Sequence, residues 1–254
     1  MCLAVVALRA HPRYPVLVAA NRDEFHCRAT APAQWWDEGW FGGRDLRADG
    51  TWLGVTRAGR WALLTNVREP ARHDPAAPSR GALVPDLLDS RNTLQEALRA
   101  ALGSGQTVNG FNLLAGESGA AIWASNRAAG TIALSAGVHG LSNAALDTPW
   151  PKLVRTIEAV ATWCAAADTN LERVLDLLGD RTLAADHELP ATGVPLEWER
   201  RLSAPFIVGD DYGTRSSTVL ALDVDGGLSF VERSFDPRGE AAGEVRASFA
   251  LGAA

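Results

Sequence analysis

Short apolar segments separated by polar turns dominate the first quarter of the chain. Residues 2–9 (CLAVVALR) and 14–21 (YPVLVAAN) are apolar and rich in β-branched side chains, and Pro12 with its polar neighbours separates them. This pattern predicts two adjacent strands of a hairpin. Residues 51–66 predict a second hairpin, because two apolar runs flank RAGR and Gly59 can take the positive φ of a tight turn. The chain therefore begins in a sheet.

The same pattern predicts further strands in the middle and at the end of the chain. Four short apolar segments are interpreted as consecutive antiparallel strands, and three more follow near the C-terminus, joined by turns at DGG and DPRG. The segments are residues 109–116, 120–126, 131–137 and 138–144, then 217–224, 227–235 and 244–252.

Helical spacing of apolar residues appears in two places between the strands. Residues 80–102 carry Leu and Val at this spacing, which predicts two short helices with Ser90 as the N-cap of the second. Residues 150–166 and 171–179 repeat apolar side chains every three or four positions and predict two more helices, the first beginning at Pro151 and the second closing at Gly179. Residues 180–212 are polar and interrupted by Pro and Gly, which predicts an irregular excursion that covers a site.

The order of these elements is strands, helices, strands, helices, strands. Grouped helices and sequential strands favour the α+β class over the alternation that builds a parallel sheet. Two antiparallel sheets between helical layers, a four-layer αββα sandwich, would use every element. At 254 residues, the chain is expected to form a single domain over 1–254.

Composition narrows the classes of function. The chain is 47% hydrophobic and 21% charged with a formal net charge of -6, and it has no Lys/Arg cluster, so a nucleic-acid partner is not expected. No apolar run is long enough to span a bilayer, and charged residues interrupt the first twenty positions, which predicts a cytoplasmic protein. Three cysteines without metal-ligand spacing predict reduced thiols and no metal site.

Cys2 directly follows the initiator methionine and is the first candidate for chemistry. Met1 is usually removed before a small residue, which would give Cys2 a free α-amine beside its thiol. An α-amine titrates near pH 7.7–8.0 and a thiol near 8.5, so the amine can accept the thiol proton and generate the nucleophilic thiolate. The alternative is a small strand residue that packs inward.

The segment NRDEF, residues 21–25, follows the second predicted strand. In an antiparallel hairpin the end of the second strand returns beside the start of the first, so Asn21, Arg22 and Asp23 are expected near Cys2. A carboxylate there would bind and orient the new ammonium, and an arginine would lower the pKa of the thiol. The alternative is an Asx turn with surface ion pairs.

Several blocks of the sequence together resemble the NRDE family, also called the transport and Golgi organisation protein 2 family. They include MCLAVVAL, AANRDEFHCRATAPAQWW, GGRDLRADGTWLGVTRAGRWALLTNVREP, GVHGLSNAALDTPWPK and YGTRSSTVLALD, and the resemblance runs from Cys2 to about Phe235. It implies an N-terminal nucleophile hydrolase-like fold. Members in eukaryotes are linked to Golgi organisation, lipid and acyl-CoA metabolism, and haem trafficking.

The chain is also similar to cysteine N-terminal nucleophile amidases of the bile-salt hydrolase and penicillin V acylase group. This resemblance implies that Cys2 is the nucleophile and that Asp23 holds its amine. Arg22 departs from the R-x-x-D arrangement of those amidases, because it stands directly before the Asp. The resemblance further implies that Asn66 or Asn143, in LTN and LSN, forms the oxyanion hole, where one donor contributes about 2.7–4 kcal/mol; for both, an Asx turn is the alternative.

The remaining candidates are assigned to substrate binding. Arg215 resembles a late active-site arginine of the amidase fold, whereas Asn21, Arg44, Trp52 and His139 accompany the polar blocks and have surface, turn or core roles as alternatives. The predicted function is hydrolysis of a linear amide or related acyl bond of a small molecule, with no cofactor. The alternative is a non-catalytic protein that binds or carries haem or an acyl ligand on the same fold.

Overall fold

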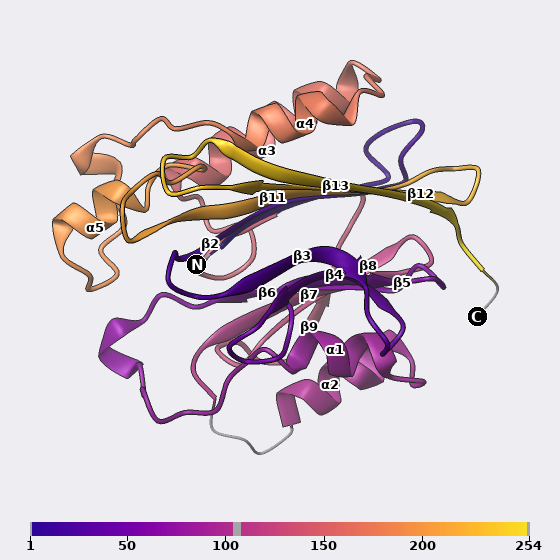
Figure 1. The fold of residues 1–254 in the computed structure, drawn as a ribbon, viewed down its shortest axis with the longest axis horizontal. Helices are drawn as coiled ribbons and strands as arrows, with labels where there is room; N and C mark the ends of the chain where they lie inside the picture. The colour runs from indigo at the N-terminus through magenta and orange to yellow at the C-terminus, as the bar shows by residue number, and fades with distance from the viewer. Residues whose placement is uncertain (1, 104–107, 253–254) are drawn as a thin grey trace.

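The computed structural model describes residues 2–103 and 108–252, and these form two antiparallel sheets between two helical layers (Figure 1). The first sheet has six strands in the order β10-β1-β2-β11-β12-β13, and the second has seven in the order β3 to β9. Helices α3 and α4 pack on the first sheet, and α1 and α2 pack on the second. The predicted αββα sandwich of the α+β class is confirmed.

The strands and helices have the following bounds. The strands are β1 (Cys2–Leu8), β2 (Val16–Phe25), β3 (Thr30–Trp35), β4 (Trp40–Asp45), β5 (Leu53–Thr56), β6 (Trp61–Asn66), β7 (Phe111–Glu117), β8 (Ala120–Ser125), β9 (Thr131–Ala133), β10 (Gly137–Leu141), β11 (Tyr212–Leu222), β12 (Gly227–Phe235) and β13 (Ala241–Ala250). The helices are α1 (Leu83–Asp89), α2 (Leu94–Gly103), α3 (Pro151–Ala165), α4 (Leu171–Leu178) and α5 (Leu196–Arg201), with 3-10 turns η1 (Pro70–Arg72) and η2 (Asp186–Glu188).

Alternation along β1 divides the core into layers. Ala4, Val6 and Leu8 lie in the cluster between the two sheets, whereas Val5 and Ala7 lie in the cluster under α3 and α4. Successive strand residues point to opposite faces, so a buried central strand must be apolar on both. A third cluster fills the space between α1, α2 and the second sheet. These three layers explain why the apolar runs of the sequence are nearly continuous.

The structure differs from the sequence-based expectation at residues 131–144. The two segments were expected to follow each other in one sheet, but β9 pairs with β8 in the second sheet and β10 pairs with β1 in the first. The chain therefore crosses from one sheet to the other between Ala133 and Gly137. Alternation identifies a strand but does not specify its partner, which is why the sequence did not reveal this crossing.

The N-cap expected at Ser90 is also wrong. Ser90 follows the last residue of α1, and Thr93 precedes α2 instead. The Thr93 hydroxyl accepts a hydrogen bond from the Glu96 amide at 3.3 Å, and the Thr93 amide donates to the Glu96 carboxylate at 3.0 Å. This reciprocal pair is a capping box, which satisfies donors that a helix start leaves exposed.

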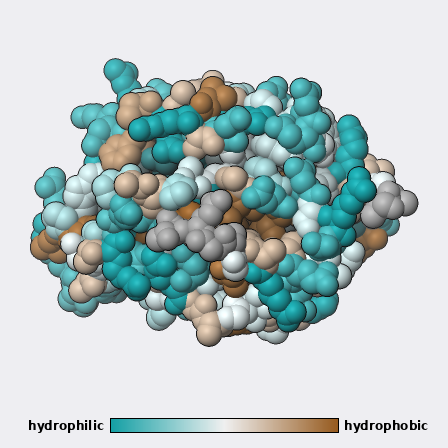
Figure 2. All heavy atoms as spheres, turned by 90° about the horizontal axis from the view of Figure 1, so that it is seen from below, coloured by the Kyte–Doolittle hydropathy of each residue, from teal (hydrophilic) through white to brown (hydrophobic). Residues whose placement is uncertain are grey.

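Hydrophilic residues cover most of the face that carries α1 and α2, and the apolar residues on it form small separate areas (Figure 2). No helix within the described ranges has the length and apolar character needed to cross a membrane.

Candidate functional site

The end of β2 and the start of β1 define the position of the site. Cys2 pairs with Arg22 and Leu3 pairs with Asn21, so Asp23 lies one position beyond the residue that pairs with Cys2. On the other side of β2, Thr214 pairs with Asp23, and a bulge separates this pair from Ser216 opposite Arg22. The expected proximity of the backbone at residues 21–23 to the start of β1 is confirmed.

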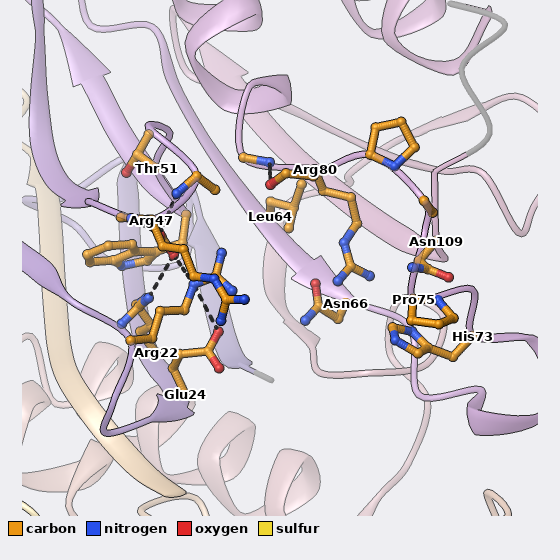
Figure 3. A pocket seen from close by; sticks show the side chains of 18 of the residues that line it. Arg22, Glu24, Arg47, Thr51, Leu64, Asn66, His73, Pro75, Arg80 and Asn109 are labelled. Carbon is orange, nitrogen blue, oxygen red and sulfur yellow. Dashed lines mark hydrogen bonds and ion pairs between the residues drawn. The ribbon is translucent and has the colours of Figure 1, made fainter.

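A pocket of about 540 Å³ opens beside this strand end (Figure 3). The end of β2 forms one wall with residues 45–52, and the end of β6 forms the opposite wall with residues 73–81 and Asn109. Figure 3 shows Arg22, Glu24 and Arg47 on one side and Asn66, Arg80 and His73 on the other. Most of these side chains are polar or charged, so the pocket suits a polar group of a ligand.

Arg22 lies in the wall of this pocket and is buried, with 4% of its surface exposed. Its guanidinium donates to the Asp45 carboxylate at 3.2 Å and to the Thr30 hydroxyl at 3.1 Å. It also lies over the Trp52 ring, 4.3 Å from the centroid. Burial works against ionisation of Asp45, but the hydrogen bonds from Arg28 and the Ala48 amide, together with the charges of Arg28 and Arg22, outweigh it and lower the pKa of this carboxyl. Arg22 and Trp52 thus form one rigid part of the wall.

Asp23 is buried, with 1% of its surface exposed. One carboxylate oxygen accepts a hydrogen bond from the Thr214 hydroxyl at 2.7 Å. Burial raises the pKa of Asp23, and the ammonium of Lys152 is the first of the influences that oppose this rise. A buried carboxyl beside a buried cation is a common feature of sites that bind or move protons.

Asn66 and Asn143 lie at or just beyond the ends of strands of different sheets and contact each other, and Asn143 is not among the described residues that line the pocket. Asn66 ends β6 and lines the pocket, whereas Asn143 follows β10. The side-chain amide of Asn143 donates to the backbone carbonyl of Asn66 at 2.8 Å, and the Asn143 carbonyl accepts from the Arg68 amide at 2.8 Å. Asn143 therefore holds the end of β6 in place, and Asn66 carries its side chain into the pocket wall.

Arg68 and Glu199 form a buried ion pair next to this junction. Their side chains are 3% and 4% exposed, and the guanidinium lies 2.6 Å from the carboxylate. Arg68 also stacks on the ring of Trp150, 4.7 Å from its centroid. Burial lowers the pKa of Arg68 even with Glu199 beside it. The pair fixes α5, from the irregular excursion, against the ends of β6 and β10.

Asn21 points to the opposite face of the first sheet from Arg22. Its amide donates to the carbonyls of Leu178 at 2.8 Å and Pro205 at 2.9 Å, and its oxygen accepts from the Ser217 hydroxyl at 2.6 Å. These bonds join the sheet to the end of α4 and to the loop between α5 and β11. Asn21 is not among the residues that line the described pocket.

Arg215 is the extra residue of the bulge in β11. One of its guanidinium nitrogens donates to the carbonyls of Phe25, His26 and Arg28 at 3.1–3.3 Å. The side chain therefore braces the turn between β2 and β3.

Two further predicted residues lie away from the pocket. Arg44 pairs with Glu38 at 2.8 Å and with Asp49 at 2.9 Å, and its guanidinium lies over the rings of Trp36 and Trp40. His139, on β10, lies 2.9 Å from the carboxylate of Asp147. Among the described residues that line the pocket, neither Arg44 nor His139 appears, whereas Trp52 does.

The structure adds residues that the sequence did not single out. Lys152, Arg68, Glu199 and Thr214 are all buried beside Asp23 or the strand ends. A lysine on the apolar stripe of a predicted helix was a readable signal for one of them. Within residues 2–103 and 108–252, no group of three or more His, Cys, Asp or Glu side chains is arranged to hold a metal ion.

Fold and site together define an αββα sandwich protein with a polar, charge-lined pocket at the strand ends between its two sheets. The sequence matches the family described as Transport and Golgi organisation 2 over residues 1–237, and the chain belongs to this family. It is 32% identical to the Transport and Golgi organization protein 2 homologs of Bos taurus, over 243 residues, and Homo sapiens, over 244, with 87% of each chain covered. The Drosophila melanogaster protein is 27% identical over 278 residues, with 94% of this chain and 95% of that protein covered.

Among solved structures, the chain resembles the Caenorhabditis elegans ortholog of N-acylethanolamine-hydrolyzing acid amidase. The TM-score is 0.48 at 11% sequence identity, over 86% of this chain and 92% of that one.

Proposed function

We propose that this protein is an N-terminal cysteine nucleophile hydrolase that acts on a linear amide or related acyl bond of a small molecule. The observation that carries the proposal is the register of the first hairpin, in which Cys2 pairs with Arg22 and Asp23 lies one position further. Removal of Met1 would release an α-amine at Cys2, whose strand partner, Arg22, directly precedes Asp23. The pocket beside Arg22 and Asp23 supports the proposal, because it offers room for a substrate.

In the proposed reaction, the α-amine of Cys2 acts as the general base for the Cys2 thiol. The amine accepts the thiol proton, and the thiolate attacks the carbonyl carbon of the substrate, forming a C–S bond and a tetrahedral oxyanion. An N–H of Asn66 stabilises that oxyanion. The intermediate collapses, the C–N bond breaks, and the leaving amine takes the proton. Water then attacks the thioester carbonyl, the C–S bond breaks, and the carboxylic acid leaves as the thiol is regenerated.

Three measurements test this proposal. Intact mass shows whether Met1 is removed, and the rate of iodoacetamide labelling compares Cys2 with an ordinary thiol. A library of acyl amides and acyl thioesters is then screened for product with wild type, Cys2→Ala and Cys27→Ser. Cys27 is an exposed free thiol outside the pocket lining, so Cys27→Ser is the matched control. We expect wild type and Cys27→Ser to release the same product and Cys2→Ala to release none.

A binding function on the same pocket is the second candidate, favoured by the relatives' names, which refer to transport. Its ligand would be haem or an acylated small molecule. Retained Met1, an inert Cys2 and a Soret band that develops on haem titration would replace the hydrolase proposal with this one. Turnover that depends on Cys2 would exclude a purely non-catalytic role.

A further inference from the structure

Lys152 is a buried cation that has no part in the reaction proposed above. It is the second residue of α3, and 1% of its surface is exposed. It is also the single lysine among 24 Lys and Arg residues. Along α3, Lys152, Thr156 and Val160 are buried at intervals of four, so the lysine lies on the stripe that packs against the first sheet. An ammonium in this position is costly unless a carboxylate compensates it.

Four buried carboxyl groups are candidates for that compensation, and three have other partners. Glu199 pairs with Arg68 at 2.6 Å, and Asp45 pairs with Arg22 and Arg28. Glu232 accepts from the Ala33 amide at 2.7 Å, in the space between the sheets. Asp23 remains as the fourth.

Strand alternation places Asp23 on the same side of the first sheet as α3. Asn21 bonds to the end of α4 on that side, and Arg22 points to the space between the sheets, so the next residue returns to the α3 side. Thr214, which donates to Asp23, also accepts from the Ile207 amide in the cluster with Tyr212. Lys152 is the first of the groups that favour ionisation of this carboxyl.

We propose that Lys152 is a positioning residue that acts through Asp23: its ammonium keeps the buried carboxylate ionised at the end of β2, so that the carboxylate can hold the amine of Cys2. This inference rests on the proposed function for its last step only. The pairing of Lys152 with Asp23 is a property of the folded chain and can be measured without a substrate. Burial disfavours the charged form of each group, and the attraction between the two opposite charges offsets that cost.

The first experiment uses the fact that the chain has one lysine. Protein labelled with ¹³C at the lysine ε-carbon gives a single lysine resonance, whose titration is followed by NMR in wild type, Asp23→Asn and Glu232→Gln. Loss of a nearby opposite charge shifts a titration by about one to three pH units. We expect Asp23→Asn to move the lysine titration to lower pH by about one unit or more, and Glu232→Gln to leave it in place. An unchanged titration in Asp23→Asn would overturn the pairing.

The second experiment separates positioning from a structural role. The pH profile of kcat/KM, or of Cys2 alkylation, is measured for wild type, Lys152→Met and Lys152→Arg. Without the ammonium, Asp23 holds its proton to higher pH, so the acid limb of Lys152→Met should move up by about one pH unit or more and Lys152→Arg should restore it. A lower rate with an unmoved acid limb would refute the positioning role.

Folding and function remain distinguishable in this design. If Lys152→Met does not fold, Lys152→Met/Asp23→Asn removes both charges, and recovery of a folded protein supports the pair, whereas a double variant that is no better overturns it. If wild type releases no product and Cys2 is inert, but Asp23→Asn still shifts the lysine titration, the hydrolase proposal fails and the charge pair stands.

Discussion

Glu232 gives the sharpest prediction about stability, because it is an acid enclosed between the two sheets. It is 2% exposed, and its oxygens accept hydrogen bonds from the Ala33 amide at 2.7 Å and the Thr218 hydroxyl at 3.4 Å. Burial raises its pKa from 4.5 to about 7. The folded chain therefore binds one more proton than the unfolded chain between these two values, and the free energy of unfolding falls as the pH rises through this window.

The size of the effect follows from the width of the window. Each pKa unit corresponds to about 1.4 kcal/mol, so a shift of roughly 2.5 units lowers the free energy of unfolding by about 3 kcal/mol once the pH exceeds 7. Glu232→Gln keeps an oxygen for the Ala33 amide and carries no charge at any pH. We expect this variant to match wild type near pH 4.5 and to be more stable by about 3 kcal/mol at pH 8.

Urea unfolding followed by tryptophan fluorescence between pH 4.5 and 8 measures this difference, because the chain has nine tryptophans. Glu240, which is exposed, supplies the control. Glu240→Gln should change the free energy of unfolding by less than about 0.5 kcal/mol at either pH. A difference between Glu232→Gln and wild type that is the same at both ends of the pH range would refute the reasoning.

Two further predictions concern the buried ion pair and the thiols. Arg68→Met leaves the buried carboxylate of Glu199 without its cation and should lower the free energy of unfolding in urea by about 3–5 kcal/mol. Arg200→Met removes an exposed ion pair of α5 with Asp186 and should lower it by about 0–1 kcal/mol. Equal losses in the two variants would contradict the assignment of Arg68 and Glu199 as a buried pair. Burial raises the pKa of the Cys164 thiol to about 11. Peptide mapping after brief iodoacetamide treatment at pH 8 should therefore find the exposed Cys27 labelled before Cys164. Labelling in the reverse order would contradict this prediction.

The first hairpin and the last three strands were predictable because their apolar patterns are strong. Strands β1, β2, β11 and β12 lie inside the first sheet, where burial requires apolar residues on one or both faces, and β13 forms its edge. The sequence also predicted that residues 21–23 return to the start of the chain, and the register from Leu3 to Leu8 fixes this. The layers of the fold followed from the order of these elements alone.

Strands β3 and β4 did not stand out in the sequence, for a physical reason. Their segments TAPAQW and WFGGRD contain Pro and two Gly residues, which are poor strand formers. In β4 the glycines are required by packing: a Cβ on Gly42 would meet the backbone oxygen of Leu53, and one on Gly43 would meet the Trp52 ring. Close approach between strands depends on tertiary structure, so local propensity could not report it.

The bulge in β11 determines which of its side chains contacts Asp23. A regular alternation of side chains along the sequence does not reveal such a bulge. If the register that holds from Ser216 onward continued without a bulge, Arg215 would stand opposite Asp23. The bulge instead gives that position to Thr214, whose hydroxyl donates to Asp23 at 2.7 Å, and turns Arg215 toward three carbonyls of the β2–β3 turn. Thr214 is a neutral donor, so its hydrogen bond does not balance the charge of the Asp23 carboxylate. Lys152, at the start of α3, is the cation that favours ionisation of Asp23 most. One inserted residue thus turns Arg215 toward the β2–β3 turn, places the Thr214 hydroxyl at Asp23, and leaves the charge of this carboxylate to be balanced by groups outside β11.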